Sequence, residues 1–144
     1  MSAISDDGVE TFKTVVIGKS GVGKTTLLVR FLENRFVKQN TTVGIDLQTK
    51  EVAYNGNKFK LELWDTAGQE RYRTIVKNYF NLSKVACVVF DLTEEDSLDE
   101  AKNWLEELTQ RCGYELPKLL LANKCDMFTP ADLNQTLEKF KERI

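Results

Sequence analysis

The chain contains no histidine, the side chain that most often serves as a general base in enzymes. Nucleophilic catalysis by a Ser-His or Cys-His pair is therefore excluded, so any chemistry must use carboxylates, amides, lysine, hydroxyls or a bound metal. Cysteine is also scarce, because Cys87, Cys112 and Cys125 form an odd and widely spaced set. Such a set is typical of reduced thiols and indicates neither a disulfide framework nor a zinc site.

Long apolar runs are absent as well. No window approaches the ~18 consecutive apolar residues of a membrane span, and the N-terminus has no signal peptide. The start, Met1-Ser2-Ala3, lacks the second-position glycine that myristoylation requires. A net charge of -2 argues against nucleic acid as a partner. We expect a cytoplasmic protein that reaches a membrane only if a lipidated tail or a partner is supplied from outside this chain.

The length of 144 residues predicts one folded domain, residues 11–144, after a flexible polar segment, residues 1–10. Apolar periodicity predicts the element order β-α-β-β-α-β-α-β-α. Asn55-Gly56 favours a tight hairpin and hence one antiparallel strand. Ser97 and Glu100 form a capping-box pattern that predicts a helix start at Ser97. The order indicates an α/β fold whose mostly parallel sheet binds ligands at the carboxyl ends of its strands. The expected strands are 12–17, 45–54, 59–64, 85–90 and 119–122, and the expected helices are 23–34, one ending at Tyr79, one from Ser97 and one from Thr129-Pro130.

The segment Gly18 to Thr25 fits the pattern G-x-x-x-x-G-K-[ST] between a predicted strand and a predicted helix. Glycines let successive backbone N–H groups approach a phosphate, and the helix N-terminus adds positive potential. Lys24 is suited to bridge the β- and γ-phosphates, and Thr25 to ligate Mg²⁺. The plainer alternative is a glycine-rich turn that binds nothing. The predicted nucleotide-binding residues of this loop are Ser20, Gly21, Val22, Gly23, Lys24, Thr25 and Thr26.

A second motif, Asn123-Lys124-Cys125-Asp126, follows a predicted buried strand. The Asp126 carboxylate can accept hydrogen bonds from N1–H and the 2-amino group of guanine, whereas adenine would leave it unpaired. Asn123 suits the O6/N7 edge of guanine, and the stem of Lys124 can lie against the base plane. Taken alone, this short motif is equally consistent with a solvated loop.

A third motif, Asp65-Thr66-Ala67-Gly68-Gln69, follows the strand that ends at Trp64. Asp65 is placed to hold Mg²⁺, and Gly68 can offer its N–H to a γ-phosphate. Gln69 can orient an attacking water. An ordinary turn would explain this motif in isolation, but three such motifs at the ends of predicted strands indicate a guanine-nucleotide site.

At these motifs the chain resembles the Ras superfamily of P-loop small G proteins, and within it the Rab branch. Lys60 to Trp64, Arg71 to Ile75 and Val89 to Thr93 carry this resemblance. It implies a three-layer sandwich in which Thr42 closes on Mg²⁺ and the γ-phosphate and Phe36 packs against the guanine. It also implies that Leu47, Trp64 and Tyr79 form an apolar effector patch, although core packing would equally explain these three.

The implied activity is slow hydrolysis of GTP, with Gln69, Lys24 and Thr42 as catalytic residues and Thr25, Thr42 and Asp65 as Mg²⁺ ligands. The stretch Thr42 to Leu47 resembles the Rab switch I segment. Neither the phosphate loop nor switch I supplies an arginine finger, and Arg71 and Arg73 are expected to be structural. The implied partners are GDP or GTP, an activating protein, an exchange factor and effectors of vesicle trafficking. The alternative is a catalytically weak or inactive Rab-like scaffold.

The sequence departs from the family pattern in three places. Switch I is one residue shorter than usual between Phe36 and Thr42. Asn81-Leu82-Ser83 replaces the usual sequence after switch II, the segment that by this resemblance begins at Asp65. The chain ends at Ile144, before the sixth strand, the Ser-Ala-Lys loop, the fifth helix and the prenylated tail of the family. We therefore expect an incomplete G domain with an exposed sheet edge, which favours a homodimer or a domain swap.

Overall fold

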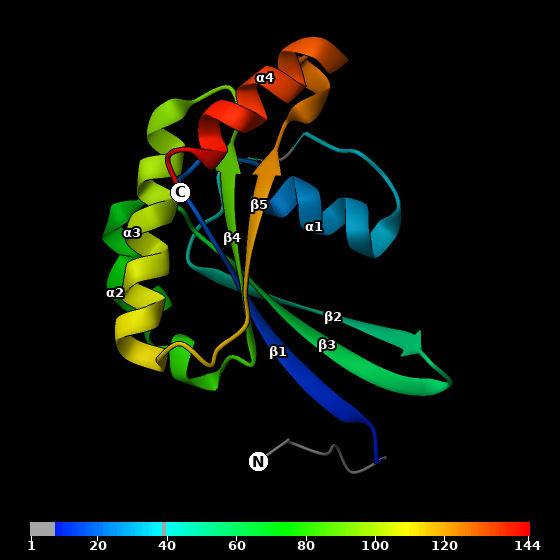
Figure 1. Cartoon of the computed structure of the whole chain (residues 1–144). Helices are drawn as coiled ribbons and strands as arrows, with labels where there is room; N and C mark the ends of the chain where they lie inside the picture. Colours follow the sequence, from blue (N-terminus) through cyan, green and yellow to red (C-terminus); the bar gives the residue numbers. More distant parts are fainter. Residues whose placement is uncertain (1–7, 39) are drawn as a thin grey trace.

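The computed structural model describes residues 8–38 and 40–144, so most of the segment expected to be flexible lies outside the described residues. Five strands and four α-helices alternate along the chain in the expected order (Figure 1). The strands are β1 (Glu10–Ile17), β2 (Ile45–Tyr54), β3 (Asn57–Thr66), β4 (Val85–Asp91) and β5 (Lys118–Asn123). The helices are α1 (Lys24–Glu33), α2 (Arg73–Lys77), α3 (Glu95–Cys112) and α4 (Pro130–Lys141).

The strands form one sheet in the order β2-β3-β1-β4-β5. β1 lies at its centre and pairs in parallel with β3 and β4, and β5 continues the parallel set beyond β4. Only β2 runs antiparallel, joined to β3 by Asn55 and Gly56, whose φ angles of 48° and 78° are those of a tight hairpin turn. The predicted α/β fold and its one antiparallel strand are confirmed.

Alternate residues of β1 face opposite sides of the sheet and so belong to two different cores. Val15 and Ile17 point toward α2, α3 and α4, where they pack with Phe90, Leu98 and other buried residues. Val16 points toward α1 and packs with Leu63, Val89, Leu28 and Val22. The sheet therefore carries helices on both faces, and the phosphate loop leaves β1 between the two layers.

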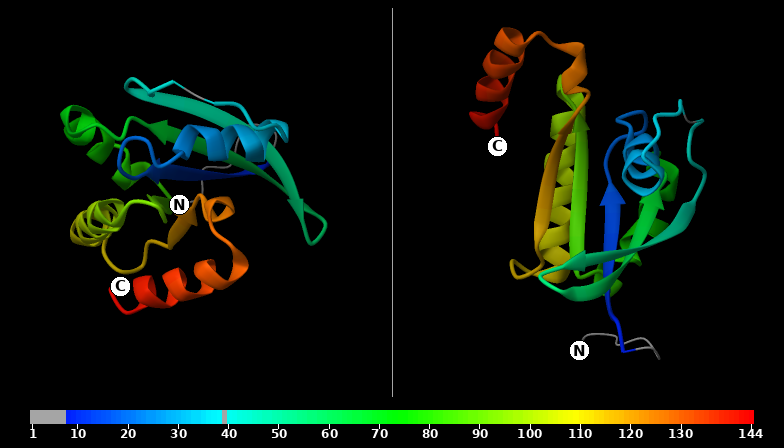
Figure 2. Two further views of the ribbon diagram at one scale, coloured as in Figure 1. Left: turned by 90° about the horizontal axis from the view of Figure 1, so that it is seen from above. Right: turned by 90° about the vertical axis from the view of Figure 1, so that its right-hand side faces the viewer.

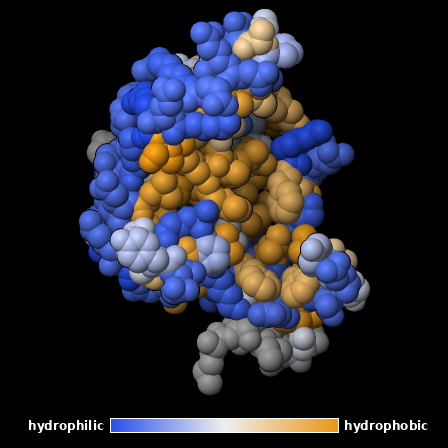
Figure 3. Space-filling view, viewed as in Figure 1, coloured by the Kyte–Doolittle hydropathy of each residue, from blue (hydrophilic) through white to orange (hydrophobic). Residues whose placement is uncertain are grey.

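Helix α1 covers only part of its face. In the right-hand view of Figure 2, α1 lies in front of the sheet, but no described helix lies in front of β4 and β5. An apolar groove of about 460 Å³ runs along this half, and Leu119 on β5 is 52 % exposed. Figure 3 shows the broad apolar surface around β5. Residues that line the groove include Phe12, Leu27, Phe31, Leu61, Cys87, Leu119 and Leu121.

Two local predictions were wrong. Ser97 does not cap α3, which begins at Glu95 after Glu94. Its buried hydroxyl instead points back to the carbonyls of Glu94, at 2.7 Å, and of Asp91 at the end of β4, at 3.0 Å, and so is not available to cap the helix. The single helix expected to end at Tyr79 is a short α2 between the 3₁₀ turns Glu70–Tyr72 and Phe80–Leu82.

The last helix agrees with its prediction. Thr129 caps α4 by accepting a hydrogen bond from Asp132 N, and Pro130 occupies the first turn. Phe140 is buried, and Leu133 and Leu137 pack against the same core. Among the described helices, none is both long and apolar enough to cross a bilayer.

Arg73 attaches α2 to α3, which gives it the structural role expected from the sequence. Its guanidinium pairs with Glu100 and Glu107, at 2.7 Å from each carboxylate, and stacks on the Trp104 ring at 4.2 Å. All of these groups are partly shielded from solvent.

Replacing Arg73 with alanine should lower the free energy of unfolding by about 1–3 kcal/mol, because it removes the stacking contact and leaves two carboxylates close together. Urea denaturation of the protein would measure this loss. Arg71→Ala is the matched control, since Arg71 is exposed and stacks only on the neighbouring Tyr72 ring. Equal losses in the two variants would contradict the role assigned to Arg73.

Candidate functional site: a phosphate pocket joined to a base-reading segment

The phosphate loop connects the end of β1 to the start of α1, as the motif predicts. Two of its glycines are required by the backbone. Gly23 has a φ of 97°, and a Cβ there would lie 2.5 Å from Asn123 Nδ2. Gly18 has a φ of 150°, and a Cβ there would lie 2.2 Å from the Val89 carbonyl oxygen. The loop can therefore fit against β4 and β5 only with glycine at these positions.

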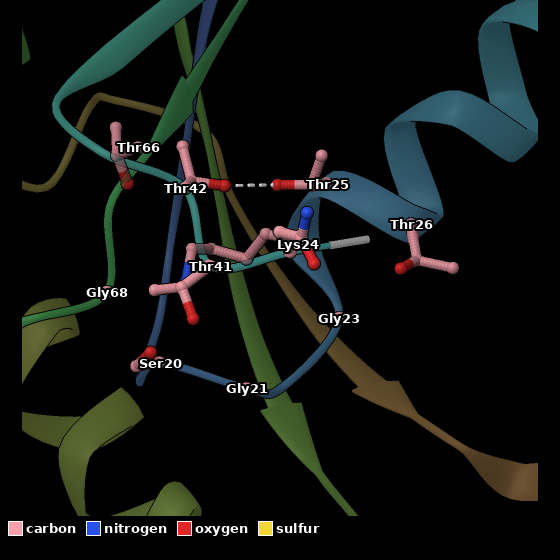
Figure 4. Close-up of a pocket in the computed structure, with 11 residues that line it drawn as sticks. Ser20, Gly21, Gly23, Lys24, Thr25, Thr26, Thr41, Thr42, Thr66 and Gly68 are labelled. Carbon is pink, nitrogen blue, oxygen red and sulfur yellow. Dashed lines mark hydrogen bonds between the residues drawn. The ribbon is translucent and has the colours of Figure 1, made fainter. Parts of the chain in front are cut away.

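A pocket of about 160 Å³ opens above this loop (Figure 4). It brings together the loop, the segment before β2 and the end of β3, which are far apart in the sequence. Its described lining residues include no large apolar side chain. The lining residues are Ser20, Gly21, Gly23, Lys24, Thr25, Thr26, Asn40, Thr41, Thr42, Thr66 and Gly68.

Lys24 is the buried cation of this pocket, with a residue exposure of only 6 %. Its Nζ donates hydrogen bonds of 2.9 Å to the carbonyl oxygens of Gly18 and Lys19. Burial lowers the pKa of Lys24 to about 8, although the nearby Asp65 carboxylate acts in the opposite direction. An anion in the pocket would restore the electrostatic stabilisation that water no longer provides.

Three oxygen-bearing side chains converge beside Lys24. The Thr25 hydroxyl donates to Asp65 Oδ2 at 2.5 Å, and Thr42 Oγ1 lies 2.6 Å from Thr25 Oγ1 (Figure 4). Burial raises the pKa of Asp65, and its Oδ1 is buried with no hydrogen-bond partner among the described residues. Hydroxyl and carboxylate oxygens are the ligands that Mg²⁺ prefers. The three residues predicted to hold Mg²⁺ thus form one oxygen cluster that fits a hard cation completed by phosphate oxygens.

Gly68, in the segment that follows β3, also lines the pocket and lies close to the phosphate loop. A Cβ at this position would come within 2.3 Å of Ser20 N and 2.6 Å of Lys24 Nζ, so only glycine allows its backbone to approach. Gln69 follows but is not among the residues that line the described pocket. Its carbonyl accepts a hydrogen bond from Tyr72 N at 3.0 Å, at the start of the 3₁₀ turn.

The motif Asn123 to Asp126, predicted to contact the base, begins at the end of β5 and is hydrogen-bonded to the phosphate loop. Asn123 Nδ2 donates to the Val22 carbonyl at 2.8 Å, and Lys124 Nζ donates to the Gly21 carbonyl at 3.0 Å. Asp126 is exposed in the 3₁₀ turn Cys125–Met127. Phe36, expected to cover the base, is 81 % exposed and does not line the pocket.

The predicted effector patch is contiguous. Leu47 and Trp64 are cross-strand partners in the β2–β3 pair, and the rings of Trp64 and Tyr79 lie 4.7 Å apart. Leu47 is 42 % exposed, whereas Trp64 and Tyr79 are half-buried. The two aromatic residues therefore contribute both to packing and to the surface.

Sequence reasoning missed several residues near the site. Asn40, Thr41 and Thr66 line the pocket, and the position of the first two beside Thr42 was the available signal. Asp91 was noticed only as part of a family signature. It is fully buried and pairs with Lys124 at 2.5 Å, a long-range contact that no local pattern indicates.

This geometry agrees with the comparisons to known proteins. The Ras family profile matches residues 13–142. The chain belongs to the Ras family. Its Rab branch is indicated by Ras-related protein Rab-18-B of Danio rerio, which is 42% identical over 125 residues, covering 85% of this chain and 61% of that protein. Ras-related protein Rab-8B of Homo sapiens is 44% identical over 120 residues, covering 81% of this chain and 56% of that protein. The Ras-family chain thus spans little more than half the length of these relatives.

Proposed function

We propose that this Rab-like chain is a molecular switch that binds GDP or GTP with Mg²⁺ and slowly hydrolyses GTP. The observation that carries the proposal is the single polar pocket in which a buried lysine, an oxygen cluster and a glycine-lined loop meet. The base-reading segment is hydrogen-bonded directly to that loop. The pocket supports phosphate binding, and the bonded segment supports guanine as the base.

Each group has a defined task in this proposal. Lys24 and the N–H groups of the phosphate loop neutralise the phosphates, and Asp126 pairs with the guanine edge. Thr25, Thr42 and Asp65 would hold Mg²⁺, which would supply positive charge that offsets the negative charge of the phosphates. Gly68 N–H contacts the γ-phosphate, while Gln69 orients the attacking water. Loss of the γ-phosphate releases Thr42 and Gly68, so both switch segments change conformation.

The direct test is to denature the purified protein and identify the released nucleotide by chromatography. Stoichiometric GDP or GTP is the expected result. Protein that releases no nucleotide, and that binds none when incubated with GDP and Mg²⁺, would overturn the proposal. Release of an adenine nucleotide would overturn the assignment of Asp126.

Replacing Gln69 with leucine should slow single-turnover GTP hydrolysis about 10–100-fold, because the water loses its orienting group. The affinity for GDP should remain within about 2-fold, since Gln69 lies outside the described lining of the pocket. Gln135→Leu on the exposed surface of α4 is the matched control. An unchanged rate in Gln69→Leu would remove Gln69 from the mechanism.

Hydrolysis by the isolated chain should be slow, because none of the described residues places an arginine in the pocket. An activating protein that supplies an arginine would accelerate it by about 10³–10⁵-fold. We further propose that effectors of membrane trafficking bind the patch Leu47, Trp64 and Tyr79, and that an exchange factor acts on the switch segments. The position of Leu47 at the end of the stretch Thr42 to Leu47, and of its cross-strand partner Trp64 directly before Asp65, supports this role.

A static scaffold remains the second candidate. The uncovered half of the sheet beside β5 favours it, because its apolar groove offers a surface on which a partner could bind without any change of nucleotide. Wild-type protein that retains GTP without hydrolysing it would support the scaffold.

We also propose a homodimer that forms through the apolar groove beside β5, where Leu119 is 52 % exposed. Light scattering across a range of protein concentrations would decide between a monomer and a dimer. A monomer at all concentrations would overturn this part.

A further inference from the structure

Asp91, the last residue of β4, is a fully buried carboxylate outside the phosphate pocket. Its Oδ1 accepts hydrogen bonds from Thr93 N at 2.8 Å and from Thr93 Oγ1 at 2.7 Å. Its Oδ2 lies 2.5 Å from Lys124 Nζ. Burial raises the pKa of Asp91, but the hydrogen bonds from Lys124 and Thr93 outweigh burial and leave it below its ordinary value. The two carboxylate oxygens therefore have different partners: Oδ1 contacts Thr93, and Oδ2 contacts Lys124.

Lys124 joins three segments of the chain. Its backbone has a φ of 64°, and its Nζ reaches both Asp91 on β4 and the Gly21 carbonyl in the phosphate loop. The neighbouring Asn123 donates to the Val22 carbonyl of the same loop. Because Asp91 is the one charged partner of the ammonium group among the described residues, that pair fixes the direction in which the lysine side chain extends.

The side chain of Asp91 is not needed to hold the end of β4. Ser97 Oγ accepts from Asp91 N at 2.9 Å and donates to the Asp91 carbonyl at 3.0 Å. Leu92 N also donates to the Asn123 carbonyl, which ties β4 to β5. The contact between Oδ1 and Thr93 shapes the following turn. These bonds hold the end of β4 without Asp91 Oδ2. This oxygen is therefore left to contact Lys124.

We propose that Asp91 is a positioning residue that slows nucleotide release by holding Lys124 across the phosphate loop. The base-reading segment and the phosphate loop then move as one unit, so a bound nucleotide leaves only when both contacts break together. This inference rests on the proposed guanine-nucleotide site and adds a residue that lies outside its lining.

The test uses the full chain loaded with a fluorescent GDP analogue and chased with excess GDP. Asp91→Asn should release the analogue about 10-fold faster or more, because the lysine loses its charged partner. Thr93→Val is the matched control. It removes one bond to Oδ1 but leaves Oδ2 on Lys124, so its release rate should stay within about 3-fold of wild type. An unchanged rate in Asp91→Asn, or equal acceleration in Thr93→Val, would overturn the proposal.

A double-mutant cycle separates positioning from general loosening of the fold. If Asp91 acts through Lys124, the double variant with Asp91→Asn and Lys124→Met should release the analogue no faster than Lys124→Met alone, within about 2-fold. If the double variant instead accelerates release by the product of the two single-variant factors, the two residues act independently and the proposal is contradicted. If Asp91→Asn does not fold, Asp91→Glu keeps the charge and should accelerate release by a smaller factor with the same non-additivity. Wild-type protein that retains no nucleotide would reject the proposed function itself, whereas bound nucleotide with an insensitive Asp91→Asn rejects only this inference.

Discussion

Replacing Lys24 with methionine should abolish nucleotide retention and at the same time make the nucleotide-free protein more stable. The loss of binding follows from the loss of charge-assisted bonds to two phosphates, which corresponds to about 10²–10⁴-fold in affinity. The gain in stability follows from burial. Lys24 is 6 % exposed and its pKa falls from 10.5 to about 8, so keeping it protonated at neutral pH costs roughly 3 kcal/mol.

Part of that cost is offset by the bonds from Nζ to the carbonyls of Gly18 and Lys19, so we expect a net gain of about 1–2 kcal/mol. Urea unfolding of nucleotide-free protein would measure the stability, and equilibrium binding of a fluorescent GDP analogue the affinity. Lys19→Met is the matched control in the same loop, because Lys19 forms exposed pairs with Glu94 and Asp96. If nucleotide-free Lys24→Met is less stable than wild type, the buried charge of Lys24 does not destabilise the fold as we expect.

Replacing Asp126 with asparagine should transfer base preference from guanine to xanthine. A carboxylate accepts hydrogen bonds from N1–H and the 2-amino group, whereas an amide also donates to the 2-oxo group of xanthine. Two charge-assisted bonds are lost to guanine, so GDP affinity should fall by about 10²–10⁴-fold. Competition of GDP and xanthosine diphosphate against a labelled nucleotide would measure the change in preference.

Asp132→Asn provides the control for this second variant, because Asp132 is an exposed carboxylate in the first turn of α4. It should leave base preference unchanged. If Asp126→Asn still prefers guanine, the base-reading role must belong to another residue. Loss of all nucleotide binding without a gain for xanthine would indicate that Asp126 holds the turn Cys125–Met127 rather than the base.

The elements and the pocket could be predicted from sequence to different degrees. Gly18, Gly23 and Lys24 are predictable because a tight strand-to-helix turn around a phosphate restricts those positions to particular residue types. The hairpin at Asn55-Gly56 is also predictable, because its tight turn requires positive φ angles that these two residue types adopt readily. Ser97 defeated the capping rule, because its hydroxyl bonds to Asp91, which belongs to another element. A capping pattern considers only the residues of the helix start itself and does not include a hydrogen-bond partner at the end of the preceding strand.

The long-range polar contacts of the site mark the limit of prediction. The bonds from Lys124 to Asp91 and to Gly21 depend on β4, β5 and the phosphate loop meeting at one edge of the sheet. The sequence indicates that these three ends are close, but not which side chains pair. Phe36 is a different case, because the exposure of an aromatic side chain in a loop depends on the ligand it would cover.

The central position of β1 has a consequence for biosynthesis. Glu10 pairs with Phe59 on β3, and Thr14 pairs with Val85 on β4, so the strand made first waits for partners made much later. Trp64, the β3 partner of Val15, is made 49 residues later. At a synthesis rate of about 5–20 residues per second, the apolar run Val15-Val16-Ile17 therefore stays unpaired for roughly 2–10 seconds. Once β3 is made it can pair with β2 at once, because these two strands are adjacent in the sequence. A nascent chain of this fold should therefore engage holding chaperones through β1 until β3 emerges from the ribosome.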